Sequence, residues 1–566
     1  MQSGEKSDEL REIIRKIAAQ NAFKHEGKAD PSSVMGKLLS LKPELRPSVK
    51  EIMPIVSEIC SEVSSITLGK LNEIYVKEDK KKQEELGLPD LPGAVQEKVV
   101  TRFAPNPNSA LHLGSSRAAI LSHDYAKKYS GKFIVRFEDT DPRLKRSDKK
   151  FYSMVKEDLR WLGCEWDEMY IQSERMEIYY KWAEEAIKIG LAYVTECDSQ
   201  SFKDLVLRSV PCPDRELSPK EHLERWYKML NGEYKEGQAV VRIKTNLDHP
   251  NPAVRDWPAL RIIDPETHSH PIAGKKYRIW PLYNWASAVD DHLMNITHII
   301  RGQEHFVNMI RQSYVYQAFG WVYPQAVHYG KLVIEGGSLS KSDIEMGIKG
   351  GKFFGYDDPR LGTLAALRRR GIEPEAIRKM IHEMGINPNT ATVSLDILYA
   401  LNRKIIDRVS NRYFGVFGEL HKLKLKGVPD QFTVSLPRHP DDPDRPRRII
   451  TVNAGGIIIE ERDFSGNSDK EVRLIGLGNF RLFDEDAQFV NNDLNYAKGL
   501  PHIQWVTENE SIGITVLMDD ATELMGKSES NITYESKGSH VQFERRFFAK
   551  IEEIKPENVY AVYTSR

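Results

Sequence analysis

The junction between an expected strand and an expected helix at residues 101–119 is the first place where this sequence could carry out chemistry. The segment reads TRFAPNPNSALHLGSSRAA, a short β-branched run, then a Pro/Asn-rich turn, then an Ala-rich helical stretch. A helix N-terminus at the carboxyl end of a parallel strand presents free N–H groups and a positive dipole end to a phosphate. Gly114 would let a flat purine lie against the backbone, and His112 could donate to a phosphate. The alternative for an isolated His-x-Gly is a helix cap with a surface histidine.

A second candidate site is the loop EGGSLSKSDIEMG at residues 335–347. Its glycines permit movement, and Lys341 between Ser340 and Ser342 supplies one cation and two hydroxyl donors. Such a loop can close over a triphosphate and neutralise the pyrophosphate that leaves. Taken alone, Ser-Lys-Ser is also a common exposed loop, and that alternative stays open.

Alternating strand and helix patterns surround both sites. Strand-like runs occur at 98–103, 132–137, 298–302 and 326–334. Helical stretches at 113–129 and 151–163 follow the first two runs. This alternation predicts a parallel α/β sheet with right-handed crossovers. Residues 196–280 are less regular and are expected to be an insertion.

The two ends of the chain have different patterns. Apolar residues keep helical spacing from Leu10 to Ala18 and from Ile52 to Ile66, so residues 1–75 are predicted to form a small helical unit. The charged run at 77–85 and the prolines after it are typical of a linker. A helical block is expected at about 362–405. Residues 411–566 contain short alternating strands separated by turn residues, which predicts antiparallel β-barrels.

Composition restricts the class of protein. Hydrophobic residues make up 40% and charged residues 29%, as in globular proteins, and Lys+Arg 81 against Asp+Glu 82 leaves a net charge of −1, so a nucleic-acid surface would have to be local. No apolar run is long enough for a membrane span, and the N-terminus lacks a signal-peptide core. The cysteines lack metal-ligand spacing and are expected to be reduced thiols of a cytoplasmic protein: Cys60, Cys164, Cys197 and Cys212.

In this order, the two sites resemble the HIGH and KMSKS motifs of class I aminoacyl-tRNA synthetases. From about residue 98 onward the chain resembles the archaeal-type glutamyl-tRNA synthetases. The segments that carry the resemblance are RFAPNPNSALHLGSSRA (102–118), IVRFEDTDP (134–142), VRIKTNLDHPNPAVRDW (241–257), YNWASAVDD (283–291), IIRGQEH (299–305), LSKSDI (339–344) and YDDPRLGTLAALRRRGI (356–372). Three positions depart from the family pattern: Ser109 stands for a common glycine, Ser115 for the second histidine, and Ser338 for the leading lysine.

The resemblance implies a multidomain α/β protein. Residues 1–95 would form an N-terminal helical domain and linker, and residues 346–410 a helical block. A Rossmann-type parallel-sheet catalytic domain would be divided into 96–195 and 281–345 by an inserted acceptor-end-binding domain at 196–280. Residues 411–566 would form the antiparallel β-barrel region that binds the anticodon.

The reaction implied by the resemblance has two steps. A substrate carboxylate attacks the α-phosphate of ATP, and the terminal ribose of tRNA then attacks the adenylate. Because neither step needs an enzyme nucleophile, His112 and Lys341 are expected to act by positioning and charge stabilisation. ATP would be bound by His112, Gly114, Ser340, Lys341 and Ser342. Mg²⁺ is expected to enter with ATP, without a metal site on the protein.

The same resemblance implies which residues bind L-glutamate: Arg102, Ala104, Glu138, Tyr283 and Arg301. Glu138 and Tyr283 would meet the α-amino group, and the arginines would offset carboxylate charge. Glutaminyl enzymes carry a small neutral residue where this chain has Arg301, which favours glutamate. Glu138 could instead be a strand-end carboxylate paired with Arg143. Arg301 could instead form a structural salt bridge.

The expected partners are tRNA(Glu) and, as is common among archaeal-type enzymes, also tRNA(Gln). Related enzymes support the inner corner of tRNA near the positions of Arg368, Arg369 and Arg370, and the run RPRR (445–448) is either a phosphate contact or a solvated loop. The protein is expected to be a cytoplasmic monomer without a membrane partner. Competing hypotheses are a glutaminyl-tRNA synthetase, an acyl-adenylating nucleotidyltransferase that works without tRNA, and a non-catalytic RNA-binding scaffold.

Overall fold

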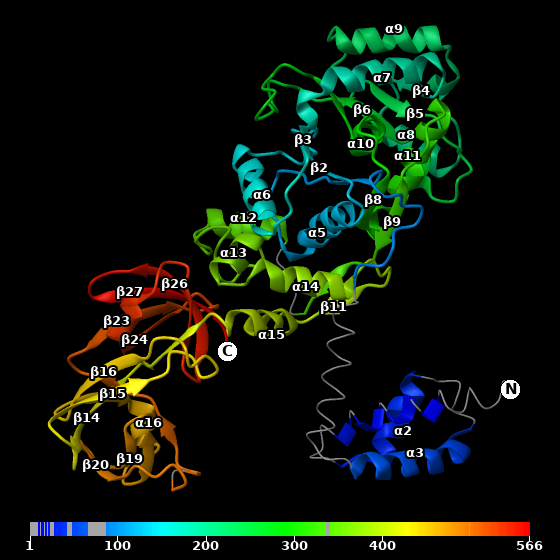
Figure 1. Ribbon diagram of the computed structural model, residues 1–566. Coiled ribbons are helices and arrows are strands. Elements are labelled where there is room, and N and C mark those ends of the chain that lie inside the picture. The colour runs from blue at the N-terminus through cyan, green and yellow to red at the C-terminus, as the bar shows by residue number, and fades with distance from the viewer. Residues whose placement is uncertain are drawn as a thin grey trace. The chain divides into compact units, whose positions relative to one another are not determined.

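The computed structural model describes residues 10–22 (except 12, 16 and 20), 28–41, 48–65, 87–335, 340–496 and 498–566 (Figure 1). The chain divides into two compact units, Met1–Pro89 and Asp90–Arg566. The linker run at 77–85 and Ser338 lie outside the described residues. No helix in the described part of the chain is long and apolar enough to cross a membrane.

The N-terminal unit is helical, as its spacing predicts. Its described elements are α2 (Pro31–Leu41), α3 (Val49–Ser64) and helical residues between 10 and 22. Residues from all three segments are buried against one another, with Ile14, Ala18, Val34, Leu38, Val56 and Ile59 fully inaccessible to solvent. The apolar stripe therefore packs on itself within this unit.

A parallel sheet forms the centre of the second unit, as predicted. Strands β1 (Val100–Phe103), β2 (Lys132–Phe137) and β3 (Glu168–Ile171) pair in that order. Helices α5 (Leu113–Lys128) and α6 (Lys149–Trp161) are the connections between them. A second parallel pair, β8 (His298–Gly302) with β9 (Gln325–Tyr329), is joined to β1 by hydrogen bonds between Val100 and Thr297. The carboxyl ends of β1, β2 and β8 thus face the same side.

The irregular middle segment contains an antiparallel sheet of four strands, β4 (Ala192–Thr195), β5 (Val240–Ile243), β6 (Pro258–Ile262) and β7 (Ile279–Pro281). Helices α7 (Met176–Lys188), α8 (Ser199–Leu207) and α9 (Pro219–Leu230) accompany this sheet. Its core contains buried tryptophans, among them Trp226, Trp257 and Trp280. Strand β4 precedes residue 196, so this sheet begins before the expected insertion. The chain then returns through α10 (Tyr283–Leu293) and α11 (Phe306–Phe319).

A helical block begins after β10 (Leu332–Ile334). Within the block lies β11 (Ala391–Val393), which pairs with β10 in parallel. Its helices are α12 (Lys341–Lys349), α13 (Leu364–Arg369), α14 (Pro374–Met384) and α15 (Leu395–Ile406). The block leads to the β-rich C-terminal region, coloured yellow to red in Figure 1.

Two seven-stranded sheets and a hairpin form that region. The first sheet contains β12 (Asn411–Tyr413), β13 (Gly415–Phe417), β23 (Ser511–Leu517), β24 (Glu523–Glu529), β25 (His540–Phe543), β26 (Phe547–Ile554) and β27 (Asn558–Ser565). The second contains β14 (Leu420–Lys426), β17 (Ile457–Glu460), β18 (Glu471–Leu474), β19 (Gly478–Leu482), β20 (Asp486–Asn491), β21 (His502–Ile503) and β22 (Val506–Thr507). The hairpin is β15 (Gln431–Leu436) with β16 (Arg448–Asn453), and α16 (Glu461–Ser465) follows β17.

Most neighbouring strands in this region are antiparallel, as predicted, but four pairs are parallel. The pairs β12–β25, β23–β27, β14–β20 and β18–β21 are parallel. Alternating polarity in a single strand predicts which face is buried but not which strand lies beside it.

Helix α5, which carries His112 at its N-cap, is fixed near its other end by a buried carboxylate. Asp124 contacts Nδ1 of His123 at 2.6 Å and Nε2 of His382 at 2.5 Å, and it also accepts a hydrogen bond from Arg378. Burial alone would raise the pKa of Asp124, but the hydrogen bonds from both histidines and the charge of Arg378 hold it well below its usual range. The contact joins α5 to α14.

We expect Asp124→Asn to destabilise the Asp90–Arg566 unit by roughly 3 kcal/mol at pH 7, because it leaves Arg378 without its carboxylate. A carboxyl whose folded pKa is depressed stabilises the fold above its unfolded pKa and loses that effect as pH falls through the folded pKa. The urea midpoint of the variant should therefore fall less steeply than that of the unmodified protein below about pH 4. Equal acid dependence in the two proteins would contradict this role.

Candidate active site

A cavity of about 380 Å³ lies at the carboxyl ends of β1, β2 and β8. Its walls come from the turn after β1, the N-terminus of α5, the start of α10 and the beginning of α12. Eight of the residues assigned to ATP or glutamate from the sequence line it: Arg102, Ala104, His112, Gly114, Glu138, Tyr283, Arg301 and Lys341. Arg102 and Lys341, which are 239 positions apart in the sequence, therefore line the same cavity.

His112 caps α5. Its backbone is extended, and its Nδ1 accepts the N–H of Ser115 at 3.3 Å. An acceptor at Nδ1 leaves the ring proton on Nε2, so Nε2 is the atom that can donate to a ligand. A Cβ on Gly114 would lie 2.9 Å from the His112 ring, which explains the need for glycine there. Burial and the charge of Lys341 lower the pKa of His112, which favours the neutral ring.

Lys341 begins α12 and approaches the turn after β1. Its Nζ donates to Oδ1 of Asn108 at 3.3 Å. Ser340 is the N-cap of the helix and forms a reciprocal capping box with Asp343, while its Oγ lies 2.8 Å from Oγ of Ser342. Ser340 and Ser342 are not part of the cavity wall. The structure thus brings Lys341 to the cavity but gives the Ser340 hydroxyl a structural role at the helix start.

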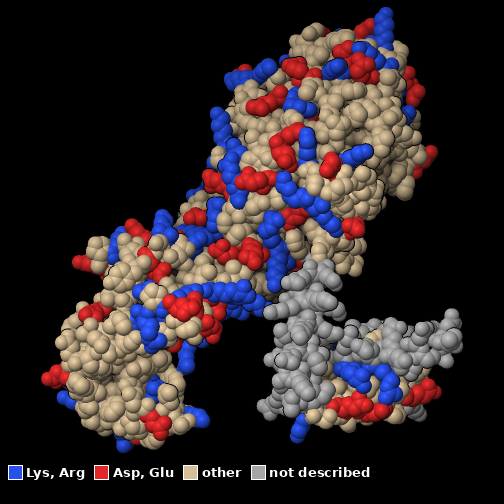
Figure 2. Space-filling model, in the orientation of Figure 1, with Lys and Arg blue, Asp and Glu red and all other residues tan. Residues whose placement is uncertain are grey.

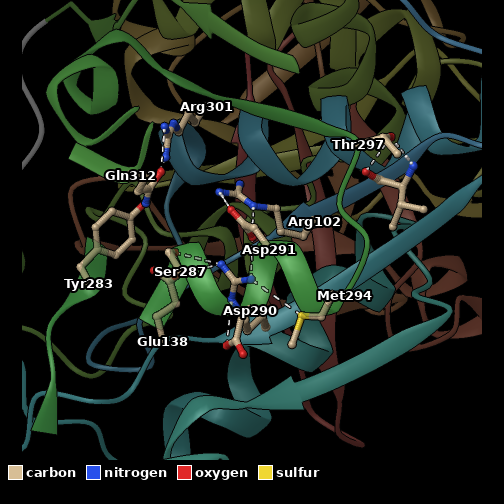
Figure 3. Close-up of polar contacts among 12 residues, drawn as sticks. Arg102, Glu138, Tyr283, Ser287, Asp290, Asp291, Met294, Thr297, Arg301 and Gln312 are labelled. Atoms are coloured by element: carbon tan, nitrogen blue, oxygen red, sulfur yellow. Dashed lines mark hydrogen bonds and ion pairs between the residues drawn. The ribbon is translucent and has the colours of Figure 1, made fainter. Parts of the chain in front are cut away.

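A buried ion network fixes the floor of the cavity (Figure 3). Arg136, on β2, is fully buried and donates to Asp291 at 2.6 Å and to Glu138 at 3.1 Å. Asp291, on α10, also accepts hydrogen bonds from Arg102 at 3.2 and 3.4 Å. Ser287 donates to Glu138 at 2.8 Å. Arg136 thereby fixes both Glu138 and the carboxylate that holds Arg102.

The neighbouring Asp290 extends this network. It accepts hydrogen bonds from Arg175 at 2.9 Å, Tyr179 at 2.6 Å and Gln172 at 3.1 Å. The group as a whole contains three arginines and three carboxylates, Arg102, Arg136, Arg175, Glu138, Asp290 and Asp291, so its formal charge is balanced. Sequence reasoning missed Arg136, Asp290 and Asp291, although an arginine inside the apolar run KFIVRF and the paired acids of AVDD signalled buried charge.

Glu138 pairs with Arg136, whereas Arg143 pairs with Glu236. The alternative in which Arg143 holds Glu138 is therefore wrong. Burial raises the pKa of Glu138, and the charges of Arg136 and Arg102 oppose that rise. Glu138 remains on the cavity wall, where one carboxylate oxygen can receive a cationic group.

Arg301 differs from the arginines of the ion network around Arg136. It is 5% exposed, and its partners are neutral: Tyr323 at 3.2 Å, Tyr283 and His328 at 3.4 Å, and Gln312 at 3.5 Å. No carboxylate among the described residues forms an ion pair with it, so the structural salt-bridge alternative has no support. Burial and the charge of Arg301 lower the pKa of His305 and of His328 to about 4. The guanidinium, labelled in Figure 3, therefore lines the cavity without an ion-pair partner among the described residues.

The arginine run of α13 faces the protein. Arg369 pairs with Glu552, Arg370 is 4% exposed beside Tyr399 and Asp519, and Arg368 lies 3.8 Å from Asp158. The expectation that this run contacts tRNA is wrong for Arg370, because its guanidinium is buried against the C-terminal sheet. In the RPRR run, Arg448 is also buried, in an ion pair with Glu529 and Glu544, so it is not part of a solvated loop.

Two family descriptions match the chain. Residues 98–408 match "tRNA synthetases class I (E and Q), catalytic domain", and residues 410–497 match "tRNA synthetases class I (E and Q), anti-codon binding domain". The chain belongs to this class I family of tRNA synthetases for glutamate and glutamine. The residues that line the cavity all fall within the part that matches the catalytic domain.

Curated relatives match over nearly the whole length. The chain is 48% identical to "Glutamate--tRNA ligase" of Thermococcus onnurineus, with 98% of this chain and 100% of the relative covered. It is 47% identical to the protein of that name from Thermococcus kodakarensis, with coverage of 99% and 100%. The corresponding values for Pyrococcus abyssi are 48% identity, 99% and 100%.

Because the charge of Lys341 lowers the pKa of His112, we expect Lys341→Met to raise the pKa of His112. Titration of the histidine resonances by NMR, with His112→Asn to assign the signal, would measure the change. Lys349→Met is the matched control, since Lys349 pairs with Glu345 away from the cavity. A His112 signal that titrates at the same pH in all three proteins would show that Lys341 does not face it.

Proposed function

We propose that this protein is a glutamate–tRNA ligase, which activates L-glutamate with ATP and transfers it to the 3′ end of tRNA(Glu). The observation that carries the choice of amino acid is Arg301, a buried cation without a carboxylate partner on the cavity wall. A substrate carboxylate at this position would be stabilised by a charge-assisted, bidentate contact. A neutral amide there would leave the buried charge unbalanced.

Glu138 and Tyr283 would bind the α-amino group of glutamate. Both line the same cavity as Arg301, and Tyr283 already contacts the Arg301 guanidinium. Arg102 would contribute positive potential rather than a bidentate hydrogen bond to the substrate, because two of its donors are already bonded to Asp291. Ala104 borders the space between these groups. This arrangement holds a zwitterionic amino acid by opposite charges at its two ends.

ATP would bind where the N-terminus of α5 meets Lys341. The free N–H groups of α5, Gly114 and Nε2 of His112 would surround the α-phosphate, and Lys341 would face the pyrophosphate. Mg²⁺ would enter with ATP and supply charge neutralisation, and the oxygen-rich triphosphate suits that hard cation. Ser340 and Ser342 would support the loop rather than bind phosphate directly.

The reaction would proceed without a covalent enzyme intermediate. Glu138 would hold the α-amino group of glutamate and Arg301 its side-chain carboxylate, which leaves the α-carboxylate in line with the α-phosphorus of ATP. The α-carboxylate then attacks the α-phosphorus as the bond to pyrophosphate breaks. His112 and the α5 N–H groups stabilise charge on the phosphate oxygens. The terminal ribose hydroxyl of tRNA then attacks the carbonyl carbon, and AMP leaves.

The remaining regions would bind tRNA. The inserted sheet with α7 to α9 would hold the acceptor end of tRNA. The two seven-stranded sheets would form the β-barrels that read the anticodon by stacking and edge hydrogen bonds. A cavity of about 190 Å³ between these two sheets is lined by Glu460, Gln504 and Arg545, and it is our candidate for a base pocket. Basic side chains, with acidic ones among them, lie across the middle of the visible face of the Asp90–Arg566 unit (Figure 2). We propose a cytoplasmic monomer.

Substitution of Arg301 by alanine should reduce kcat/KM for glutamate by a factor of roughly 10² to 10⁴, because losing the partner of a buried charge costs on the order of 3–5 kcal/mol. The relative use of glutamine should rise. Aminoacylation of tRNA with both amino acids measures this ratio. Arg311→Ala is a control on the exterior of α11, where the guanidinium donates to the Ala253 carbonyl. An unchanged glutamate-to-glutamine ratio in Arg301→Ala would remove Arg301 from the substrate site.

We propose further that tRNA(Gln) is also charged, with a kcat/KM within about tenfold of that for tRNA(Glu), a difference of roughly 1.4 kcal/mol or less. The two anticodons differ at one position, so discrimination would require one base pocket that rejects the wrong base. Charging purified transcripts of both tRNAs decides this. A preference for tRNA(Glu) above about a thousandfold would show a discriminating enzyme.

The alternatives give different results. A tRNA-independent adenylating enzyme would show glutamate-dependent ATP–pyrophosphate exchange that saturating tRNA leaves unchanged. A glutaminyl enzyme would charge glutamine in preference to glutamate. A non-catalytic scaffold would bind tRNA without detectable aminoacylation.

A further inference from the structure

Gln312 is a buried amide on α11 that contacts Arg301 without being part of the cavity wall. Its Oε1 accepts hydrogen bonds from the Tyr323 hydroxyl at 2.7 Å and from one Nη of Arg301 at 3.5 Å. The Tyr323 hydroxyl accepts from the same Nη of Arg301 at 3.2 Å. The three side chains therefore form a closed set of contacts beside the cavity, and Figure 3 labels two of them, Gln312 and Arg301.

The donors and acceptors of this set determine the direction of each hydrogen bond. A guanidinium only donates, so both oxygens beside Arg301 must accept from it. The Tyr323 hydroxyl has one proton, which it donates to Oε1 of Gln312. Nε2 of Gln312 has no hydrogen-bond partner among the described residues. The buried amide therefore acts through its oxygen, which orients the Tyr323 hydroxyl and, with it, the guanidinium of Arg301.

Helix α11 holds this set in place. Tyr316 lies one helical turn after Gln312, on the same face of the helix. The rings of Tyr316 and Tyr323 meet edge to face, with centroids 4.8 Å apart. Tyr316 is 2% exposed, so its ring is fixed in the core. Two side chains of α11 thus position the tyrosine that contacts Arg301.

The oxygen that Gln312 offers to Arg301 carries no formal charge. Arg102, on the same cavity wall, shows the opposite case, because its partner at 3.2 Å is the carboxylate of Asp291. A carboxylate attracts a guanidinium by its full charge, whereas an amide oxygen attracts it only as a dipole. Gln312 therefore orients a guanidinium without cancelling its charge.

The other groups near Arg301 leave its charge in place as well. Tyr283 and His328 contact the guanidinium at 3.4 Å. His328 has a pKa lowered to about 4 by burial and by the charge of Arg301, so this ring is neutral at pH 7. Glu304 also lines the cavity but forms no ion pair with Arg301 among the described contacts. The residue at position 312 therefore decides whether this cation has an anionic partner within the protein.

We propose that Gln312 is a positioning residue that keeps Arg301 both oriented and charged for the side-chain carboxylate of the substrate. It acts through Arg301 and Tyr323 and does not touch the substrate itself. An acid at position 312 would pair with Arg301, as Asp291 pairs with Arg102, and the site would lose its preference for an anionic side chain. This inference rests on the proposed function, because it takes a substrate carboxylate to be the ligand of Arg301.

Gln312→Glu tests the inference, since it adds a charge while it keeps the shape of the side chain and the acceptor for Tyr323. In aminoacylation of tRNA(Glu) by the full-length enzyme, we expect kcat/KM for glutamate relative to glutamine to fall roughly tenfold or more, as for loss of one charge-assisted contact. The KM for ATP should stay unchanged. Gln317→Glu adds the same charge at an exposed position of α11 and should behave as the unmodified enzyme does. An unchanged glutamate-to-glutamine ratio in Gln312→Glu would overturn the proposal.

Gln312→Met is a second variant, which removes the acceptor without placing an acid in the core. It should raise the KM for glutamate several-fold, because the Tyr323 hydroxyl and Arg301 lose their common acceptor. The KM for ATP should not change, and glutamate should remain preferred over glutamine, because Arg301 keeps its charge. A KM for glutamate equal to that of the unmodified enzyme would contradict a positioning role for Gln312.

Arg301→Ala separates this inference from the proposed function. A glutamate-to-glutamine ratio that stays unchanged in Arg301→Ala would remove the substrate carboxylate from Arg301, and both proposals would be wrong. A ratio that falls in Arg301→Ala but not in Gln312→Glu would overturn the role of Gln312 alone.

Discussion

The buried guanidinium of Arg136 is the constraint on which the catalytic region depends. Removing a charge from water costs several kcal/mol even after the protein relaxes, and carboxylates beside a buried arginine offset that cost. Asp291 and Glu138 do so for Arg136, and Asp290 lies 3.9 Å away. These acids come from α10 and from the end of β2. One ion network therefore fixes the position of α10 against the central sheet.

The same network determines the charge of the cavity. Arg102, at the end of β1, is neutralised by Asp291, so it adds little free positive charge to the cavity. Arg301, at the end of β8, has only neutral partners and retains its charge. The cavity wall therefore carries both the Arg301 guanidinium and the Glu138 carboxylate. A ligand with an ammonium group and a side-chain carboxylate complements this pattern, which is why we favour glutamate over its neutral amide.

Local rules predict the parallel sheet, whereas the glutamate-binding residues of the cavity are predicted by the family resemblance. Carboxyl ends of parallel strands meet at one edge, which accounts for His112, Glu138 and Arg301 lining the same cavity. The network around Arg136 could not be predicted, since nothing in a single sequence says which buried acid pairs with which buried base. The resemblance likewise assigns Arg102 to the substrate, whereas in the structure Arg102 pairs with Asp291.

Long-range packing accounts for the other differences. The run at Arg368 to Arg370 looks like an RNA contact by composition, but Glu552 and the buried position of Arg370 depend on the C-terminal sheet, which is almost two hundred residues away in sequence. The four parallel strand pairs of that region likewise join segments far apart along the chain. Local alternation contains no information about such pairs.

A crystal structure of the protein with bound L-glutamate would test the central claim most directly. The account predicts the side-chain carboxylate within hydrogen-bond distance of the Arg301 guanidinium, the α-amino group on Glu138, and Arg102 still held by Asp291. A side-chain carboxylate bound to Arg102, with Asp291 displaced and Arg301 unliganded, would contradict it.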